Sequence, residues 1–255
     1  MDDWLMRLAQ TRLSLFDIWR CCKEPWRIDV GLTSPKDVIS TIDAAAALLD
    51  SVSASQLEDF RQTLIHNDIF WNTLNNTQAR QRHSRTILED WGVIVYLLVR
   101  AVKADTIVET GVFDGASSAL ILQALYDNNA GHLMSIDLPA TERIDMSVGG
   151  PLPSGCQPGW LIPDYLKHRH SLFLGDSKTW LPRILGTHSK IDIFVHDSLH
   201  TREHQLWEYS AVWPHIKEGG FLLSDDIYAS PAFHRFCRSQ SKSYVCSRGF
   251  GGVRK

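Results

Sequence analysis

Three aspartates follow two segments that have the composition of buried strands. The segment 191–197, IDIFVHD, ends in Asp197, and the segment 220–226, GFLLSDD, ends in Asp225 and Asp226. If the two strands are neighbours in a parallel sheet, their carboxyl ends bring these three acids to one edge. Carboxylates that share a site repel one another, so one protonates unless a cation is present. All-oxygen ligands favour Mg²⁺, Mn²⁺ or Ca²⁺ over Zn²⁺, so the pattern predicts a hard divalent cation.

The alternative is that the three acids act separately, as helix caps or in salt bridges. Asp225 and Asp226 can share one ion only if the chain has left strand geometry there, because adjacent strand residues face opposite ways. His196, just before the first of the three acids, is expected to face the other way and to be structural. His204 and Glu208 have the i, i+4 spacing of a helical metal pair, but we expect a solvated helix face for them.

A glycine-containing turn follows an earlier candidate strand, 105–110. Glu109, Gly111 and Gly115 form the pattern E-x-G-x-x-x-G, which differs from the G-x-G-x-x-G of dinucleotide-binding folds. Glycines at such a turn let the backbone approach a ligand at a helix N-terminus. An acid at the strand end would repel pyrophosphate and suits a ligand that carries an ammonium group or hydroxyls. The alternative is an ordinary strand–helix turn.

The next two candidate strands also end in acids. Asp137 follows the segment 131–137 and can accept hydrogen bonds from a ribose diol, or act as a helix cap or surface acid. Asp176 follows the segment 171–175 and precedes Ser177. It can accept a hydrogen bond from an adenine amino group or cap the next helix, and the sequence favours neither.

Two different patterns divide the chain. Residues 1–103 have helical periodicity: Pro35 suits a helix start for 35–50, Ser55 with Glu58 resembles a capping box for 55–70, and a further helix is expected over 84–103. From residue 105 short strands alternate with helices, which predicts βαβ units and a mostly parallel sheet. The expected helices there are 115–127, 159–168, 177–186, 202–217 and 231–240, and the last expected strands are 243–247 and 251–254. The segment 138–158, rich in Pro and Gly, is expected to be a lid or mobile.

Composition excludes several classes of protein. The 255 residues are 44% hydrophobic with a formal net charge of -3, and no basic block indicates nucleic-acid binding. Five cysteines without a C-x-x-C pair argue against a disulfide framework or a zinc site. The acidic N-terminus does not resemble a signal peptide, and the apolar run at 91–102 is too short to span a bilayer. We therefore expect a cytoplasmic protein with no membrane partner, and the nine tryptophans are compatible with a homo-oligomer.

The strand ends together resemble a class I S-adenosylmethionine-dependent methyltransferase over roughly 84–255. The family motif of an acid followed by glycines matches Glu109, Gly111 and Gly115, with Phe113 at the place of the usual central glycine. The stretches GWLIPDYLKHRHSLFLGDS, IDIFVHDSLHT and GGFLLSDDI are similar to the bacterial small-molecule subfamily of macrocin-, mycinamicin- and novobiocin-type sugar O-methyltransferases. The tail SRGFGGVRK resembles the reversed last strand pair of that fold.

The resemblance implies an α/β, Rossmann-like fold with a seven-stranded, mostly parallel sheet, an antiparallel last strand and a helical extension over 1–83. It implies S-adenosylmethionine and Mg²⁺ or Mn²⁺ as cofactors, with His200 as general base beside Asp197. The implied metal ligands are Asp197, Asp225 and Asp226, and the implied cofactor contacts are Glu109, Gly111, Gly115, Ser117, Asp137, Asp176 and Ser177. His200 can instead be a structural histidine, and Arg85 is expected on an exposed helix face although it could pair with the cofactor carboxylate.

These observations predict an O-methyltransferase that acts on a hydroxyl of a small metabolite, a sugar or natural product. The N-terminal region, 1–83, is expected to cover the substrate or to mediate self-association. Three alternatives stay open: a metal-independent N- or carboxyl methyltransferase, a module that binds S-adenosylmethionine without catalysis, and a nicotinamide-dependent oxidoreductase, against which the glycine spacing argues. The sequence contains no motif that identifies the acceptor.

Overall fold

The computed structural model describes residues 40–78, 91–142, 152–247 and 249–255. The expected helix start at Pro35, Arg85, and residues 143–151 of the predicted lid lie outside these ranges. Across the described ranges, no helix has the length and apolar character needed to cross a bilayer.

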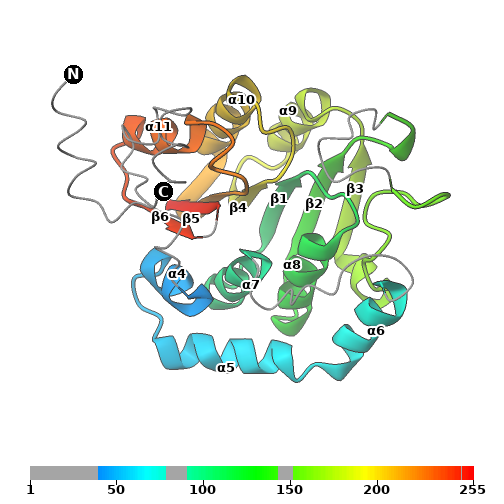
Figure 1. Ribbon diagram of the computed structural model, residues 1–255. Coiled ribbons are helices and arrows are strands. Elements are labelled where there is room, and N and C mark those ends of the chain that lie inside the picture. The colour runs from blue at the N-terminus through cyan, green and yellow to red at the C-terminus, as the bar shows by residue number, and fades with distance from the viewer. Residues whose placement is uncertain (1–39, 79–90, 143–151, 248) are drawn as a thin grey trace, which may run out of the picture.

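A seven-stranded sheet in the order β3-β2-β1-β4-β5-β7-β6 forms the centre of the fold (Figure 1). The pairs among β1 to β5 are parallel, and β7 lies antiparallel between β5 and β6. The predicted mostly parallel sheet with a reversed last strand is confirmed. The strands are β1 (Thr106–Thr110), β2 (His132–Asp137), β3 (His170–Leu174), β4 (Ile191–His196), β5 (Ile216–Ser224), β6 (Tyr244–Ser247) and β7 (Phe250–Arg254).

Helices cover both faces of the sheet (Figure 1). One face carries α9 (Ser177–Thr187), α10 (Arg202–Val212) and α11 (Ala232–Ser239). The other carries α4 (Thr41–Leu48), α5 (Ala54–Ile65), α6 (Asp68–Gln78), α7 (Trp91–Val102) and α8 (Ala116–Asp127). Short 3₁₀ helices are η2 (Ala140–Glu142), η3 (Asp164–Arg169) and η4 (Trp213–His215).

The side chains of each strand alternate between the two helical layers, as a period of two requires. In β4, Ile193 and Val195 join the core formed with α7 and α8, whereas Phe194 joins the core formed with α9 to α11. The same alternation places Ile107 and Val108 of β1 in different cores. This alternation determines which helical layer each polar residue at a strand end will face.

The N-terminal helices differ from the sequence prediction. The cap of α5 is Ser53, whose Oγ accepts a hydrogen bond from Gln56 N at 3.2 Å, and not Ser55. The predicted helix 55–70 is two helices, because α5 ends at Ile65 and the Asn67 side chain caps α6 by accepting from Phe70 N at 3.0 Å.

Two later predictions also need correction. The predicted helix 159–168 is only the 3₁₀ helix η3, because Gly159 N and Leu161 N instead donate to the carbonyls of Phe113 and Asp114, each at 2.9 Å. The predicted helix 202–217 ends at Val212. Pro214, which has no N–H to donate, lies in the 3₁₀ turn that follows, and β5 begins at Ile216, four residues before the predicted strand.

Candidate functional site

The ends of β1 and β4 approach each other closely at Gly111. A Cβ on Gly111, whose φ is +84°, would meet the carbonyl oxygen of Asp197 at 1.9 Å. The amide of Asp197 also donates to the Thr110 carbonyl at 2.8 Å. The backbone of the neighbouring strand end therefore requires a glycine here, and the expected approach of a ligand to this glycine stays a prediction. The consequence is that Asp197 lies directly beside the β1–α8 loop.

The β1–α8 loop contains two further left-handed residues. Gly115 has a φ of +93°, and a Cβ there would meet Gly159 Cα at 2.7 Å. Phe113, at the place of the resembled family's central glycine, has a φ of 53°. A left-handed φ is strained for a residue that has a side chain, so Phe113 adopts under strain a conformation that a glycine would adopt freely.

Glu109 is completely buried on the side of the sheet that faces α8. Its carboxylate accepts hydrogen bonds from the hydroxyls of Ser118 at 2.6 Å, Ser135 at 2.8 Å and Ser117 at 3.3 Å. Burial raises the pKa of Glu109 to about 7, although the three hydroxyl bonds act in the opposite direction. Two of the predicted cofactor residues, Glu109 and Ser117, thus contact each other beneath the loop.

Asp137, at the end of β2, holds the β1–α8 loop in place. Its Oδ2 accepts from the amides of Val112 at 3.1 Å and Phe113 at 2.7 Å, and its Oδ1 accepts from the Leu138 amide at 2.7 Å. The carboxylate therefore brings the end of β2 against the turn that contains Gly111. Sequence reasoning identified this acid but did not foresee its bonds to the loop backbone.

Asp176 and Ser177 begin α9. The Asp176 side chain caps the helix by accepting from Lys178 N at 2.9 Å, which is one of the two roles considered for it. Ser177 is buried, and its hydroxyl lies 3.2 Å from Nε2 of His204 on α10. Asp176 is exposed at the same edge of the sheet as Asp137.

The acids that follow β4 and β5 influence one another strongly. Burial raises the pKa of Asp197 well above its usual range, and Asp225, Glu109 and Asp226 raise it further by charge repulsion. A side-chain hydrogen bond between Asp197 and Asp225 has the same effect. Strand β5 ends at Ser224 and Asp226 has a φ of 48°, so the chain has left strand geometry where the sequence argument required it.

His200 lies between two of these acids. Its Nε2 is 3.6 Å from Asp197 Oδ1, and its Nδ1 is 3.5 Å from Asp226 Oδ2. Burial and the neighbouring His196 lower the pKa of His200 to about 4, against the opposite effect of the Asp226 and Glu208 carboxylates, so the ring is neutral at pH 7. Within the described ranges, no group of three or more His, Cys, Asp or Glu side chains is arranged to hold a metal ion.

His204 and Glu208 are not on a solvated helix face, so that expectation was wrong. His204 is buried and Glu208 is completely buried, and His204 Nε2 lies 2.9 Å from Glu208 Oε1. His196 faces the same layer, with Nδ1 at 2.6 Å from Glu208 Oε2. The strand alternation that directs His196 and Thr110 toward α10 was the sequence signal for this buried cluster.

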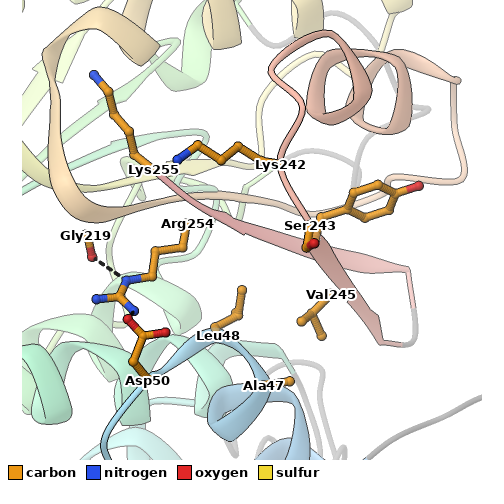
Figure 2. A pocket seen from close by; sticks show the side chains of 10 residues that line it. Ala47, Leu48, Asp50, Gly219, Lys242, Ser243, Val245, Arg254 and Lys255 are labelled. Carbon is orange, nitrogen blue, oxygen red and sulfur yellow. Dashed lines mark hydrogen bonds and ion pairs between the residues drawn. The ribbon is translucent and has the colours of Figure 1, made fainter.

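A cavity of about 560 Å³ lies at the opposite edge of the sheet (Figure 2). It is lined by residues of α4, β5, β6 and β7 and of the segments next to them, among them Asp50, Lys242, Arg254 and Lys255. Arg254 pairs with Phe221 at the amino end of the regular part of β5, whereas Asp225 follows the carboxyl end. The cavity is therefore remote from the acids.

Three comparisons with known proteins bear on this geometry. Residues 108–227 match a methyltransferase domain. The match covers just under half of the chain and runs from β1 to the residue after Asp226, so it contains every predicted site residue. The expectation of a methyltransferase is confirmed for this domain.

The named relatives share little sequence with the chain. The L-olivosyl-oleandolide 3-O-methyltransferase of Streptomyces antibioticus is 27% identical over 62 residues, which are 24% of this chain and 16% of that protein. The chain thus matches only a small part of the length of this curated relative.

Solved structures establish the fold. The SAH-bound methyltransferase PaMTH1 of Podospora anserina superposes with a TM-score of 0.51 at 14% identity, over 81% of this chain and 99% of that one. The cofactor-bound Rv0187 from MTB gives a TM-score of 0.50 at 13% identity, over 80% and 98% of the two chains. The predicted Rossmann-like architecture is confirmed.

Proposed function

We propose that this protein is an S-adenosylmethionine-dependent O-methyltransferase that acts on a hydroxyl of a small sugar or natural product, assisted by Mg²⁺ or Mn²⁺. One observation carries the proposal: Asp197 and the acids that follow β5 lie close together beside the β1–α8 loop. Open α/β folds bind ligands at this edge of the sheet. The named 3-O-methyltransferase activity of the Streptomyces antibioticus relative supports a hydroxyl acceptor.

The β1–α8 loop and the ends of β2 and β3 would hold the methyl donor, which supplies an electrophilic methyl group when bound. Gly111 and Gly115 keep the loop backbone close to the sheet, with Glu109 and Ser117 beneath it. Each carboxylate oxygen has two lone pairs. Asp137, at the end of β2, would accept from the donor's ribose hydroxyls, and the exposed Asp176, next to Ser177, would accept from its adenine amino group.

His200 would remove the proton from the acceptor hydroxyl. A general base must be unprotonated, and burial satisfies this condition by lowering the pKa of His200 to about 4. Its side chain is 13% exposed, between Asp197 and Asp226. Nε2 is buried without a hydrogen-bond partner among the described residues, so a neighbouring side chain would have to shift to let the acceptor hydroxyl reach it.

The donor set suits a hard cation. Asp197, Asp225 and Asp226 offer only oxygen ligands, and burial together with the negative charges of its neighbours raises the pKa of Asp197. A bound divalent cation would supply positive charge and lower the pKa of an acceptor hydroxyl. The Asp226 side chain is 64% exposed and lies beyond the end of β5. We therefore expect Asp226 to be the acid that moves when all three acids bind one ion.

A second candidate function is a methyltransferase that uses the same edge without metal. The lack of a preassembled group of three ligands within the described ranges favours it. In that case His200 and the acids would orient the acceptor by hydrogen bonds alone.

A screen with radiolabelled S-adenosylmethionine and a panel of sugars, phenols and natural products tests both functions. The proposal predicts labelled product from a hydroxylated acceptor, with transfer abolished by EDTA and restored by Mg²⁺. Transfer that is insensitive to EDTA would favour the metal-independent candidate. Donor binding in calorimetry without transfer to any member of the panel would indicate a binding module.

A further inference from the structure

Glu208 on α10 is a completely buried carboxylate that accepts four hydrogen bonds. Its Oε2 accepts from Thr110 Oγ1 and from His196 Nδ1, each at 2.6 Å. Its Oε1 accepts from Ser198 Oγ at 3.1 Å and from His204 Nε2 at 2.9 Å. Both oxygens are thus saturated by side-chain donors.

These donors belong to segments that carry predicted site residues. Thr110 immediately precedes Gly111, and His196 and Ser198 lie on either side of Asp197. His204 extends the network to the hydroxyl of Ser177 at the start of α9. A single carboxylate from one helix therefore connects the ends of β1 and β4 with the first residue of α9.

The bonds to Glu208 are strong because both partners are withdrawn from water. Charge-assisted hydrogen bonds are roughly twice as strong as neutral ones. A buried donor that has no acceptor destabilises the fold by the full free energy of removing it from water. Removing the carboxylate would leave four donors without an acceptor around Asp197 and Gly111.

We propose that Glu208 is a positioning residue, which fixes Asp197 and the β1–α8 loop relative to each other through its bonds to Thr110, His196 and Ser198. The proposal rests on the proposed function for its effect on methyl transfer, but its structural part is independent of that function. Glu208 contacts no reacting atom in this scheme and acts through the residues that it holds.

Glu208→Gln is the principal test because it preserves the shape and removes one acceptor oxygen. The amide nitrogen must face either Thr110 and His196 or Ser198 and His204, so the ring N–H of one histidine loses its acceptor, whereas the hydroxyl of that pair can rotate and accept from the amide. We expect kcat for methyl transfer to fall at least tenfold, with a similar loss of donor affinity in calorimetry, at a temperature where the variant is folded. Glu208→Asp keeps the charge on a shorter stem and is expected to recover part of the loss.

Hydrogen exchange reports the positioning directly and needs no acceptor. The Asp197 amide donates to Thr110 O at 2.8 Å, and the Asp225 amide donates to His196 O at 2.9 Å. In Glu208→Gln both amides are expected to exchange about tenfold faster than in the wild type. This readout also remains available in Glu208→Asp if Glu208→Gln does not fold.

Two variants serve as matched controls. Glu203→Gln removes an exposed acid from the first turn of the same helix. Asp127→Asn removes a mostly buried acid from another network, where Tyr96 Oη, Gln123 Nε2 and Arg100 Nη1 donate to it at 2.6, 2.7 and 3.1 Å. The first is expected to change neither readout, and the second to lower stability while exchange at Asp197 and Asp225 stays protected.

The outcomes separate the two proposals. If Glu208→Gln keeps wild-type protection at Asp197 and Asp225, Glu208 does not position them, whatever its effect on stability. If exchange increases equally in Asp127→Asn, the effect is general destabilisation and the positioning role is rejected. If the wild type does not bind S-adenosylmethionine, the proposed function fails, and the exchange experiment still decides the role of Glu208.

Discussion

Charged side chains are paired differently at the two edges of the sheet, the amino edge, where the parallel strands begin, and the carboxyl edge, where they end. At the amino edge, Arg254 forms an ion pair with Asp50 and donates to the Gly219 carbonyl, as Figure 2 shows. Lys255 Nζ donates to the carbonyls of Trp213 at 2.7 Å and Ile216 at 2.9 Å. At the carboxyl edge, Asp197 lies among other acids, and the adjacent His200 is neutral at pH 7.

The difference indicates which edge is built for a ligand. Charges that are paired within the fold contribute to structure, whereas a group of like charges must take up a proton or bind a partner of opposite charge, which is why such groups are common at functional sites. Arg254 and Lys255, which line the cavity at the amino edge, have partners within the fold, and the carboxyl edge has the unbalanced negative charge. We therefore assign the candidate site by electrostatics and topology, and not by concavity.

The largest expected effect is that of removing Asp197. Asp197→Ala should reduce methyl transfer by about 10³-fold, because it removes a proposed metal ligand and the carboxylate that lies beside His200. Initial rates with saturating Mg²⁺ and labelled donor measure this effect. A rate within a factor of about two of the wild type would mean that Asp197 does not contribute to methyl transfer. The carboxyl edge would then no longer be favoured over the amino edge as the site.

Replacing His200 should have the next largest effect. His200→Gln preserves hydrogen bonding but cannot accept the acceptor's proton, so we expect kcat to fall by about 10²-fold, within the usual range for a positioned base. The KM for S-adenosylmethionine should stay unchanged, because His200 is expected to contact the acceptor. An unchanged kcat would mean that His200 is a structural histidine and not the general base.

Glu109 gives a pH-dependent prediction for stability. Its pKa is raised by burial to about 7, above the usual value for an unfolded chain, so the folded protein binds this proton more tightly. Its contribution is fully present below about pH 4.5 and is lost as the pH rises through about 7, by roughly 3 kcal/mol in total. The unfolding free energy of the wild type should therefore fall relative to Glu109→Gln between about pH 5 and pH 8.

Urea unfolding of both proteins at several pH values measures the Glu109 effect. A constant difference in unfolding free energy across that range would mean that Glu109 has an ordinary pKa. Burial among the three serine hydroxyls would then not raise the pKa of Glu109.

Changes at the amino edge should have the smallest effects. Arg254→Ala breaks a pair in which Asp50 is 81% exposed, so we expect at most about 1 kcal/mol of lost stability and no change in methyl transfer. Lys242→Ala, in the same cavity, should change neither. A large loss of activity in either variant would show that the two edges do not differ in function.

The sequence predicted the sheet and the acids at its carboxyl edge because both depend on local patterns. Alternating apolar runs marked β1, β2 and β4, and the acid that ends each run was visible without a structure. The position of Asp226 outside strand geometry could also be anticipated, because two adjacent acids cannot face one ion from a regular strand.

The network around Glu208 could not be recognised in the same way. His204, Gln205 and Glu208 form a polar face of α10, which resembles a solvated face, yet all three are buried. Their burial depends on donors far away in the chain, such as Thr110, which lies 98 residues from Glu208. Likewise, the reason for Gly111 is the backbone of Asp197, which no local motif can reveal.

The most direct test of the central claim is an anomalous diffraction map of crystals grown with Mn²⁺ and S-adenosylhomocysteine. The account predicts an anomalous peak among the carboxylates of Asp197, Asp225 and Asp226, next to S-adenosylhomocysteine lying along the Gly111–Gly115 loop. S-adenosylhomocysteine in that position without a manganese peak would support the metal-independent methyltransferase. A ligand found only in the cavity near Arg254 and Lys242 would contradict the assignment of the site to the carboxyl edge.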